Sequence, residues 1–228
     1  MSLTLGLLHT SCVLVPKFAE LCEQTMPQVA IFHVVDESLI KNTIAAQGLE
    51  KATARRVLRL ILNAREAGAD AVLVTCSSIG PAVQVARRIF EFPVLRVDEP
   101  MAEEAVQLGS RIGVLATLAT TLRPTVDLLR EVAAARSRSI EVVECLCDGA
   151  FEAFLSGDNE THDGIVLRAL MRLIESVEVV VLAQASMAGV VERIAAERLV
   201  KPVLSSPALA VRRACEVLLG VTPQTVSV

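Results

Sequence analysis

An internal repeat is the feature that most constrains how this 228-residue chain can fold. Three short segments recur in the same order, at offsets of 107, 108 and 109 residues. One short match carries little weight, but three at nearly constant spacing indicate two copies of one structural unit. The matched pairs are Gly6–Thr10 with Gly113–Thr117, Asp70–Ser78 with Glu178–Ser186, and Pro93–Leu95 with Pro202–Leu204.

Runs of Val, Leu and Ile alternate with helical periodicity along the chain, a pattern typical of α/β proteins with buried parallel sheets. In the first copy a helix is predicted from about Glu50 to Ala67, with Gly68 as its C-terminal stop. We therefore expect the α/β class, with two pseudo-symmetric lobes that are each an open, mostly parallel sheet flanked by helices. The strands predicted in the first copy are residues 3–8, 29–35, 71–75 and 94–97.

The repeat also predicts where the lobes divide. The helix at about Pro207–Leu219 corresponds to the helix that follows Asp98, so we expect the end of the chain to pack onto the first lobe. The first lobe is then residues 1–99 plus 205–228, and the second is residues 100–204.

Ligands of open parallel sheets bind beyond the carboxyl ends of the strands. Residues that follow equivalent strands in the two lobes are therefore expected to face one another. This places Thr10 opposite Thr117, and Cys76 opposite Gln184.

Composition excludes several classes of function. Lys and Arg total 22 against 26 Asp and Glu, a net charge of -4, so no basic field attracts nucleic acid. Aromatic residues are 3% and all are Phe, which leaves few stacking platforms for single strands. No stretch has the ~18 uncharged apolar residues of a membrane span, and Met1–Leu8 lacks the basic start of a secretory signal. We therefore expect a cytoplasmic protein with no nucleic-acid or membrane partner, rather than an exported solute-binding protein.

Six cysteines without a dense framework indicate core residues in a reducing compartment, with one candidate reactive thiol. Cys145 and Cys147 lie two apart on a predicted strand, and without a second pair at zinc spacing a core role is preferred to a metal site. Cys76 differs because it ends an apolar strand just before a predicted helix N-terminus. That position lowers a thiol pKa, so Cys76 is either a base or nucleophile, or a buried small residue.

Three segments resemble the main motifs of the aspartate/glutamate/hydantoin racemase superfamily, a group that includes arylmalonate decarboxylase and maleate isomerase. The similarity covers essentially the whole chain, including the two-lobe plan. Members use two cysteines, one from each lobe, to remove and return the proton on the carbon next to a carboxylate, without any cofactor. The segments are Val-Thr-Cys-Ser-Ser at 74–78, Gly-Val-Leu-Ala-Thr-Leu-Ala-Thr-Thr at 113–121 and Val-Leu-Ala-Gln-Ala-Ser-Met-Ala at 181–188.

The resemblance places Cys76 on the family's first catalytic cysteine. Ser77 and Ser78 fall where members have small polar residues that grip the substrate carboxylate, and Thr117 falls on the matching residue of the second lobe. Gln184 replaces the second cysteine, and its amide does not exchange a proton at neutral pH. One-sided chemistry remains, in which Cys76 moves a proton or attacks the substrate while Gln184 and the hydroxyls stabilise an enediolate-like intermediate. Arylmalonate decarboxylase also works with a single cysteine, but it retains the one in the second lobe.

His9 is the best placed group to supply the missing acid, because an imidazole titrates near neutrality and His9 ends the first strand. The alternative is a polar residue that is hydrogen-bonded at a strand end. His33 lies within a strand, and His162 lies in the polar segment 156–163, for which we expect a surface turn in preference to a lid. The catalytic candidates are therefore Cys76, Gln184 and His9.

The substrate-binding candidates also follow strand ends. Thr120 and Thr121 precede Pro124, whose fixed φ suits a helix start, so one hydroxyl is expected to cap that helix and the other to reach a carboxylate oxygen. Asp36 and Asp98 are expected to cap helices rather than take part in chemistry. The candidate residues are Thr10, Ser11, Ser77, Ser78, Thr117, Thr120, Ala185 and Ser186.

These observations favour an enzyme of racemase or isomerase type that needs no cofactor and no metal, and that acts next to the carboxylate of a small acid through a single cysteine. A decarboxylase of a malonate-like acid on the same scaffold is an alternative. Gln184 motivates another class, a protein that binds or senses a small carboxylate without chemistry. A chain that is 53% hydrophobic is also consistent with a homo-oligomer, although no surface for it is predicted.

Overall fold

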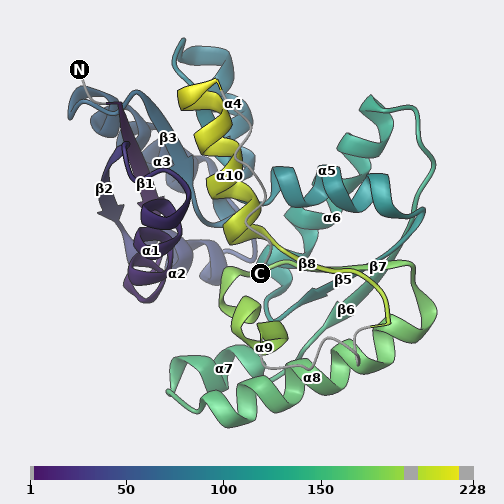
Figure 1. Ribbon diagram of the computed structural model, residues 1–228. Coiled ribbons are helices and arrows are strands. Elements are labelled where there is room, and N and C mark those ends of the chain that lie inside the picture. Colours follow the sequence, from purple (N-terminus) through teal and green to yellow (C-terminus); the bar gives the residue numbers. More distant parts are fainter. Residues whose placement is uncertain (1–2, 193–199, 221–228) are drawn as a thin grey trace. The chain divides into compact units, whose positions relative to one another are not determined.

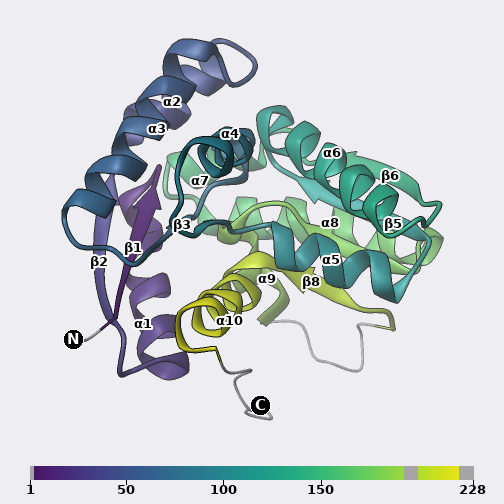
Figure 2. The same cartoon turned by 90° about the horizontal axis from the view of Figure 1, so that it is seen from above.

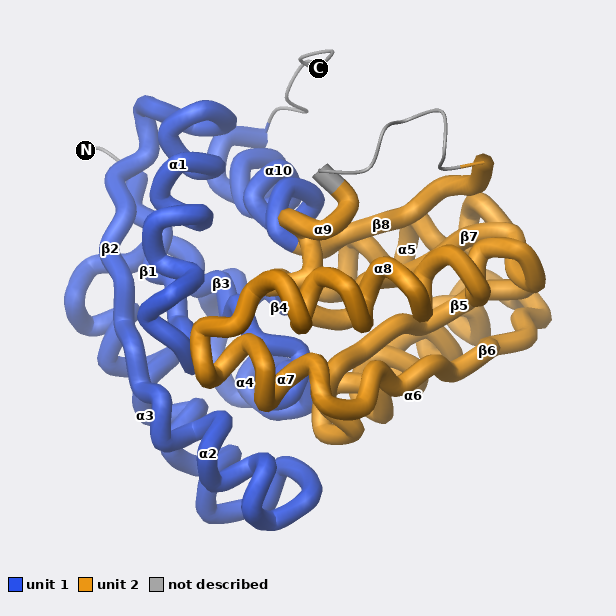
Figure 3. Tube along the Cα trace, turned by 90° about the horizontal axis from the view of Figure 1, so that it is seen from below, with its two compact units in different colours: residues 1–97, 207–228 blue, residues 98–206 orange. Residues whose placement is uncertain are grey.

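The computed structural model describes residues 3–192 and 200–220 of the chain. The chain divides into two compact units, Met1–Val97 with Pro207–Val228 as unit 1 and Asp98–Ser206 as unit 2 (Figure 3). Each unit holds one four-stranded sheet in which all paired strands are parallel. This confirms the expected α/β class, with helices flanking both sheets.

Unit 1 has the strand order β2-β1-β3-β4. Strands β2, β1 and β3 are labelled in Figures 1 and 2. The bounds are β1 (Thr4–His9), α1 (Val15–Thr25), β2 (Ala30–Val35), α2 (Glu37–Ala45), α3 (Lys51–Glu66), β3 (Ala71–Val74), α4 (Pro81–Ile89), β4 (Val94–Arg96) and α10 (Ser206–Leu219). Two short 3-10 turns follow strands, η1 (Cys12–Leu14) after β1 and η2 (Ser77–Ile79) after β3.

Unit 2 has the corresponding order β6-β5-β7-β8. Its 3-10 turn η3 (Ala185–Met187) follows β7, as η2 follows β3. The bounds are α5 (Glu99–Leu108), β5 (Arg111–Ala116), α6 (Ala119–Ala135), β6 (Glu141–Leu146), α7 (Ala150–Leu155), α8 (Asn159–Ser176), β7 (Val179–Leu182), α9 (Ala188–Glu192) and β8 (Val203–Ser205).

The pairing register repeats as well as the strand order. In unit 1, Leu5 of β1 lies beside Ala71 of β3. In unit 2, Ile112 of β5 lies beside Val179 of β7, at offsets of 107 and 108 residues from the first pair. A register slip of one residue would turn every side chain of a strand to the other face, so equal registers give the two sheets equivalent faces.

The last helix of each sequence copy packs in the other copy's unit. Helix α5 follows β4 along the chain, yet it belongs to unit 2, where it packs on α6 and β7. Almost all of α10, which follows β8, belongs to unit 1. There the Cys215 thiol donates a long hydrogen bond to the Thr25 carbonyl at the end of α1, with the two atoms 3.9 Å apart.

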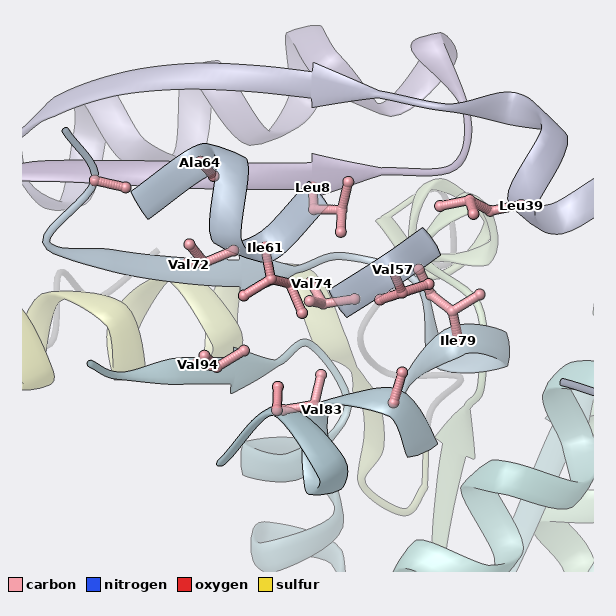
Figure 4. Close-up of a cluster of buried hydrophobic side chains, with 13 residues drawn as sticks. Leu8, Leu39, Val57, Ile61, Ala64, Val72, Val74, Ile79, Val83 and Val94 are labelled. Carbon is pink, nitrogen blue, oxygen red and sulfur yellow. The ribbon is translucent and has the colours of Figure 1, made fainter. Parts of the chain in front are cut away.

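The core of unit 1 shows why an amphipathic helix covers this sheet (Figure 4). Val57, Ile61 and Ala64 lie on one stripe of α3 and are buried against the sheet, where they join Leu8 and Val74 in one cluster. The spacing of four and three residues keeps the stripe on one side of the helix. Burial of each large side chain contributes roughly 1.5–3 kcal/mol, which holds α3 against β1 and β3.

Alternate residues of a strand point to opposite faces of the sheet. Leu8 and Val74 belong to the cluster under α3, so Leu7 and Leu73 point to the opposite face. His9 shares that opposite face, and its ring lies edge-on to the ring of Phe18 in α1, with 5.5 Å between centroids. Helix α1 therefore covers one face of the sheet and α3 covers the other. Among the described residues, no helix is long and apolar enough to cross a membrane.

Candidate functional site

The direction of the connections reverses between the first and third strands of each sheet. In unit 1, α1 leads from β1 outward to β2, and the chain then crosses back to β3 on the other side of β1. Ligands of open α/β sheets bind beyond the carboxyl ends of the strands at such a reversal. The residues just past those ends are Thr10 and Cys76 in unit 1, and Thr117 and Gln184 in unit 2.

Cys76 opens the turn η2, and its sulfur is surrounded by hydrogen-bond donors. The Thr10 hydroxyl, the main-chain N–H groups of Ser78 and Ile79, and the Ser78 hydroxyl all donate to it. Part of the Cys76 surface stays exposed, while its apolar side packs against the cluster under α3. The thiol is thus held at the β1/β3 reversal by groups from both strand ends.

Burial raises the pKa of the Cys76 thiol, and the four donated hydrogen bonds only partly offset this effect. The prediction of a lowered pKa was wrong. Helix α4 begins at Pro81, beyond the turn η2, so its positive end does not act directly on the sulfur. Dense protein packing around the sulfur disfavours the charged thiolate more than the local donors favour it.

Ser77 and Ser78 lie in η2 and are both buried. Ser78 donates hydrogen bonds to the Cys76 sulfur from its main-chain N–H and its hydroxyl. Thr10 is also buried, whereas Ser11 is partly exposed and precedes η1 without a side-chain cap hydrogen bond. The structure brings Thr10 and Ser78 to the thiol, and a substrate role for these four residues stays a prediction.

His9 is wholly buried, and both of its ring nitrogens are hydrogen-bonded within unit 1. Its Nε2 lies 2.9 Å from Nδ1 of His33, and its Nδ1 lies 2.9 Å from the Thr75 hydroxyl oxygen. That hydroxyl donates in turn to the Leu8 carbonyl at 3.0 Å. Burial, followed by the nearby His33, lowers the pKa of His9 to about 4. These contacts disfavour His9 as a group that exchanges protons with a substrate.

Sequence reasoning missed His33 and Thr75 as members of this cluster. In the parallel sheet His33 pairs with Leu7 and so shares the face of His9. Without the register of β2 against β1, a histidine inside a strand gives no indication of its partner. Burial also lowers the pKa of His33.

In unit 2 the Gln184 amide is hydrogen-bonded to Thr117. The amide oxygen accepts hydrogen bonds from the Thr117 main-chain N–H at 2.6 Å and from its hydroxyl at 3.0 Å. The amide nitrogen lies 2.7 Å from the same hydroxyl oxygen, to which it can donate. Thr10 with Cys76 and Thr117 with Gln184 are therefore equivalent contacts in the two units, but only Cys76 can titrate.

Ala185 and Ser186 lie in η3 directly after Gln184, and both are partly exposed. Thr120 lies in the first turn of α6, and its hydroxyl oxygen is buried without a hydrogen-bond partner among the described residues. No threonine caps α6, so that prediction was wrong. The helix begins at Ala119, with Leu118 at the N-cap, and Pro124 lies inside it.

Pro124 fits inside α6 because only one internal hydrogen bond is missing there. The ring nitrogen carries no hydrogen, so the Thr120 carbonyl one turn earlier loses its usual helical partner. The sequence prediction treated the proline as a helix start, although it lies too far from the N-terminus for that role. The buried stripe of α6, which includes Val126 and Leu129, outweighs this cost.

The interpretation of segment 156–163 as a solvated surface turn fails at His162. This residue lies in α8, is 2% exposed and contacts the Phe154 ring with 5.6 Å between centroids. Its Nδ1 is 2.8 Å from the Asp163 carboxylate, and within the described part of the chain its Nε2 has no hydrogen-bond partner. Asp158 caps α8 by accepting from the Thr161 N–H, so the polar residues begin a helix.

One of the two expected acidic helix caps is confirmed. Asp36 accepts from the Ser38 N–H at 3.0 Å at the start of α2 and pairs with Arg56. Asp98 occupies the N-cap position of α5, but its side chain makes no cap hydrogen bond. Its backbone is helical rather than extended, so the carboxylate cannot fold back onto the first free N–H groups.

The arrangement supports proton transfer by one thiol. In the described parts of the chain, residues 3–192 and 200–220, no three His, Cys, Asp or Glu side chains gather in a way that could hold a metal ion. Cys147 is buried in the core of unit 2 with Cys145 packed against that core, as the sequence predicts. Cys76 is the thiol at the strand reversal of unit 1, with donors placed to stabilise its thiolate when it forms.

Comparison with known proteins identifies relatives of this fold. A sequence profile of the Asp/Glu/Hydantoin racemase family matches residues 6–214. No curated protein matches the chain. The allantoin racemase from Klebsiella pneumoniae has a TM-score of 0.69 at 20% identity, over 98% of this chain and 91% of that chain.

Two further solved structures have the same fold. The glutamate racemase from Francisella tularensis subsp. tularensis SCHU S4 has a TM-score of 0.73 at 15% identity, over 99% of this chain and 85% of that one. The aspartate racemase from Picrophilus torridus has a TM-score of 0.69 at 14% identity, over 94% and 93%. At these identities the likeness shows the fold alone.

Proposed function

Because the chain belongs to the Asp/Glu/hydantoin racemase family, we propose that it moves a proton at the carbon next to the carboxylate of a small acid, without a cofactor and with Cys76 as its single proton-transfer thiol. Family membership makes the chain a racemase-like enzyme. The contrast between Cys76 and Gln184 at equivalent strand ends is the observation that carries the single-thiol part of the proposal.

The proposed reaction begins with Cys76 as a thiolate. The thiolate takes the proton from the carbon next to the carboxylate, and the electron pair of the broken C–H bond moves into an enediolate-like intermediate. Hydroxyl and main-chain donors near the thiol, with the Gln184 amide, stabilise the added charge. Cys76 then returns a proton to the same carbon. The substrate carboxylate is assigned to Ser77, Ser78 and Thr117, as the family resemblance implies.

A single thiol predicts a stereochemical outcome. Inversion needs a proton donor on the face opposite the base, and an amide such as that of Gln184 does not supply one at neutral pH. Cys76 alone therefore exchanges the proton with solvent and retains configuration, or isomerises a substrate in which return to one face yields the product. The proposed activity is thus proton transfer at one face of the carbon.

Proton NMR in heavy water tests this proposal. The substrate panel contains aspartate, glutamate, hydantoins including allantoin, and maleate. The measurement is loss of the signal from the hydrogen on the carbon next to the carboxylate or, in the hydantoins, next to the ring carbonyl. Cys76→Ala is expected to slow exchange by about 10²- to 10⁴-fold, the usual contribution of a general base. Cys12→Ser, which changes an exposed thiol, is the matched control. Exchange that survives Cys76→Ala contradicts the proposal, and binding of a dicarboxylate without exchange favours the binding or sensory alternative.

The raised pKa of Cys76 favours a second candidate, decarboxylation of a malonate-like acid. In that reaction the C–C bond to one carboxylate breaks, carbon dioxide leaves and the electron pair stays on the carbon as an enediolate. The neutral thiol then donates its proton to one face, and the thiolate regains a proton from water. A thiol that is protonated at neutral pH is ready for this step.

Substituted malonates distinguish the two candidates. Release of carbon dioxide with formation of one product enantiomer supports decarboxylation. Deuterium uptake without release of carbon dioxide supports the isomerase-type reaction. In both cases Cys76→Ala is the inactive reference and Cys12→Ser is the active one.

A further inference from the structure

Three side chains of unit 1 form a directed hydrogen-bonded chain. The Thr75 hydroxyl has one hydrogen, and it donates that hydrogen to the Leu8 carbonyl, so it accepts from Nδ1–H of His9. A neutral His9 then has a bare Nε2, which accepts from Nδ1–H of His33. Each distance in the chain is 2.9 or 3.0 Å. The contacts therefore fix the tautomers of both imidazoles and link β2, β1 and the end of β3.

Unit 2 has no such chain at the corresponding positions. Ala116 ends β5 where His9 ends β1, and Ala183 follows β7 where Thr75 follows β3. Glu144 pairs with Val114 in the register that His33 has with Leu7. Because the two sheets share topology and register, the hydrogen-bonded chain is not required by the fold. The hydrogen-bonded chain is found in the unit whose strand ends carry Cys76.

The chain lies behind the thiol, on the other face of the sheet. His9 and Thr75 point to the face covered by α1, as the contact with Phe18 shows. The next residues along the two strands are Thr10 and Cys76, and Cys76 packs on the opposite face. Any shift of the backbone at His9 or Thr75 therefore moves the Thr10 hydroxyl relative to the Cys76 sulfur to which it donates.

We propose that His33, His9 and Thr75 are positioning residues, whose hydrogen-bonded chain ties the strand ends together and so keeps the Thr10 hydroxyl on the Cys76 sulfur. The importance of this for turnover rests on the proposed function. The positioning itself does not, because it is measurable as reactivity of the thiol. Loss of the chain weakens the Thr10 hydrogen bond, which stabilises the thiolate form, and so slows attack by Cys76 on an added electrophile.

Alkylation of the full-length protein by iodoacetamide between pH 6 and 10.5 tests the proposal. Trypsin releases residues 66–87 with Cys76 as their only cysteine, and residues 1–17 with Cys12 as theirs, so mass spectrometry follows both thiols in one sample. Thr75→Val removes the hydroxyl, and Thr75→Ser keeps it. His33→Leu removes the donor, and His33→Asn supplies an N–H at the place of Nδ1. Glu144→Leu changes the equivalent position of unit 2 and is the matched control.

Thr75→Val and His33→Leu are expected to slow Cys76 alkylation at pH 8 by about fivefold relative to Cys12, the effect of one lost hydrogen bond. Their rate profiles are expected to move to higher pH. Thr75→Ser, His33→Asn and Glu144→Leu are expected to stay within about twofold of the parent chain. His33 lies on the edge strand and is partly exposed, so the His33 pair provides the test if Thr75→Val does not fold.

An unchanged Cys76 profile in folded Thr75→Val and His33→Leu overturns the proposal, and so does an equal loss in Glu144→Leu. Failure of the proposed function looks different, since turnover then survives Cys76→Ala while the alkylation results stand. Where a substrate is found, the same two variants are expected to lower kcat with little change in KM, because the chain positions the thiol and does not touch substrate.

Discussion

The two units are alike at one edge of their sheets and different at the other. At the amino edge of unit 1, the Asp70 carboxylate accepts from the Thr4 N–H at 2.9 Å. At the amino edge of unit 2, Glu178, which lies 108 residues after Asp70, accepts from the Arg111 N–H at 2.9 Å. Each acid precedes the third strand of its sheet and satisfies a free N–H at the start of the first strand. The duplicated scaffold thus keeps the same closing contact in both copies.

The carboxyl edges have diverged. Unit 1 has His9, Thr75 and Cys76 at the strand reversal, and the equivalent positions of unit 2 hold Ala116, Ala183 and Gln184. In both units a threonine hydroxyl contacts the second residue after the third strand, so the geometry is shared while the chemistry differs. The comparison teaches that shared topology sets where a site lies, and that a few side chains at the reversal decide what it does.

Among the substitutions that test this comparison, Gln184→Cys is expected to have the largest effect on activity. On the proposed function, a thiol in place of the Gln184 amide supplies a proton donor at the strand end equivalent to that of Cys76. We expect inversion of configuration to rise by at least about 10²-fold, as general acid catalysis contributes, while exchange in heavy water continues. Polarimetry beside proton NMR measures the two rates on one sample. Gln184→Ala removes the amide without adding a thiol, and inversion that appears equally in that variant contradicts a proton-transfer role for this position.

Leu8→Ala and Leu115→Ala test whether the two cores are equivalent. These residues lie 107 positions apart, at the same register of β1 and β5, and both are wholly buried. Each substitution is expected to lower the free energy of unfolding by about 2–5 kcal/mol, through lost burial and a residual cavity. Hydrogen exchange read separately in each unit locates the loss. A cost under about 1 kcal/mol at one site alone would show that its core refills the cavity and is packed differently.

Much of the fold was predictable because local patterns decide it. The predicted strand 71–75 corresponds to β3 at Ala71–Val74, and the predicted helix Glu50–Ala67 corresponds to α3 at Lys51–Glu66. An apolar run bounded by polar residues and a helical stripe are visible in the sequence itself. The repeat then extended the prediction from one unit to the other.

The errors concern properties that only packing decides. The pKa of Cys76 is raised because protein atoms surround the sulfur, and that burial depends on residues far along the chain. His162 was interpreted as solvated because its neighbours in sequence are polar, yet α7 packs over it and buries it. The partner of His33 depends on the register between β1 and β2, which no local pattern specifies.

Acid sensitivity is expected to lie in unit 1. The pKa of His9 is about 4 in the folded chain, lowered first by burial and then by His33, against about 6.5 when unfolded. The unfolded chain therefore binds more protons between these values, so the stability is fully present above pH 6.5 and falls as the pH drops toward 4. The loss is expected to reach about 3 kcal/mol, and His9→Gln is expected to flatten this part of the pH profile. Denaturant unfolding from pH 8 to pH 4 measures it. If the free energy of unfolding of His9→Gln falls as steeply with pH as that of the parent chain, His9 is not the source of the acid sensitivity.

The smallest expected effect on stability concerns the amino edges of the two sheets, where Asp70 and Glu178 make equivalent contacts. Hydrogen bonds from the Arg111 and Ser110 N–H groups, and then from the Ser110 hydroxyl, lower the pKa of Glu178. The stability from this carboxylate is therefore present above the unfolded pKa of about 4.5 and is lost as the pH falls through the lower folded value. Solvent weakens so exposed a contact. Glu178→Gln should lower the melting temperature slightly at pH 7 and hardly at all at pH 3. Asp70→Asn should change it less, because the Asp70 carboxylate accepts one hydrogen bond at this edge whereas Glu178 accepts three. A larger fall in melting temperature for Asp70→Asn would contradict this expectation. It would show that the negative charge matters more at Asp70 than at Glu178, although the two acids occupy equivalent positions.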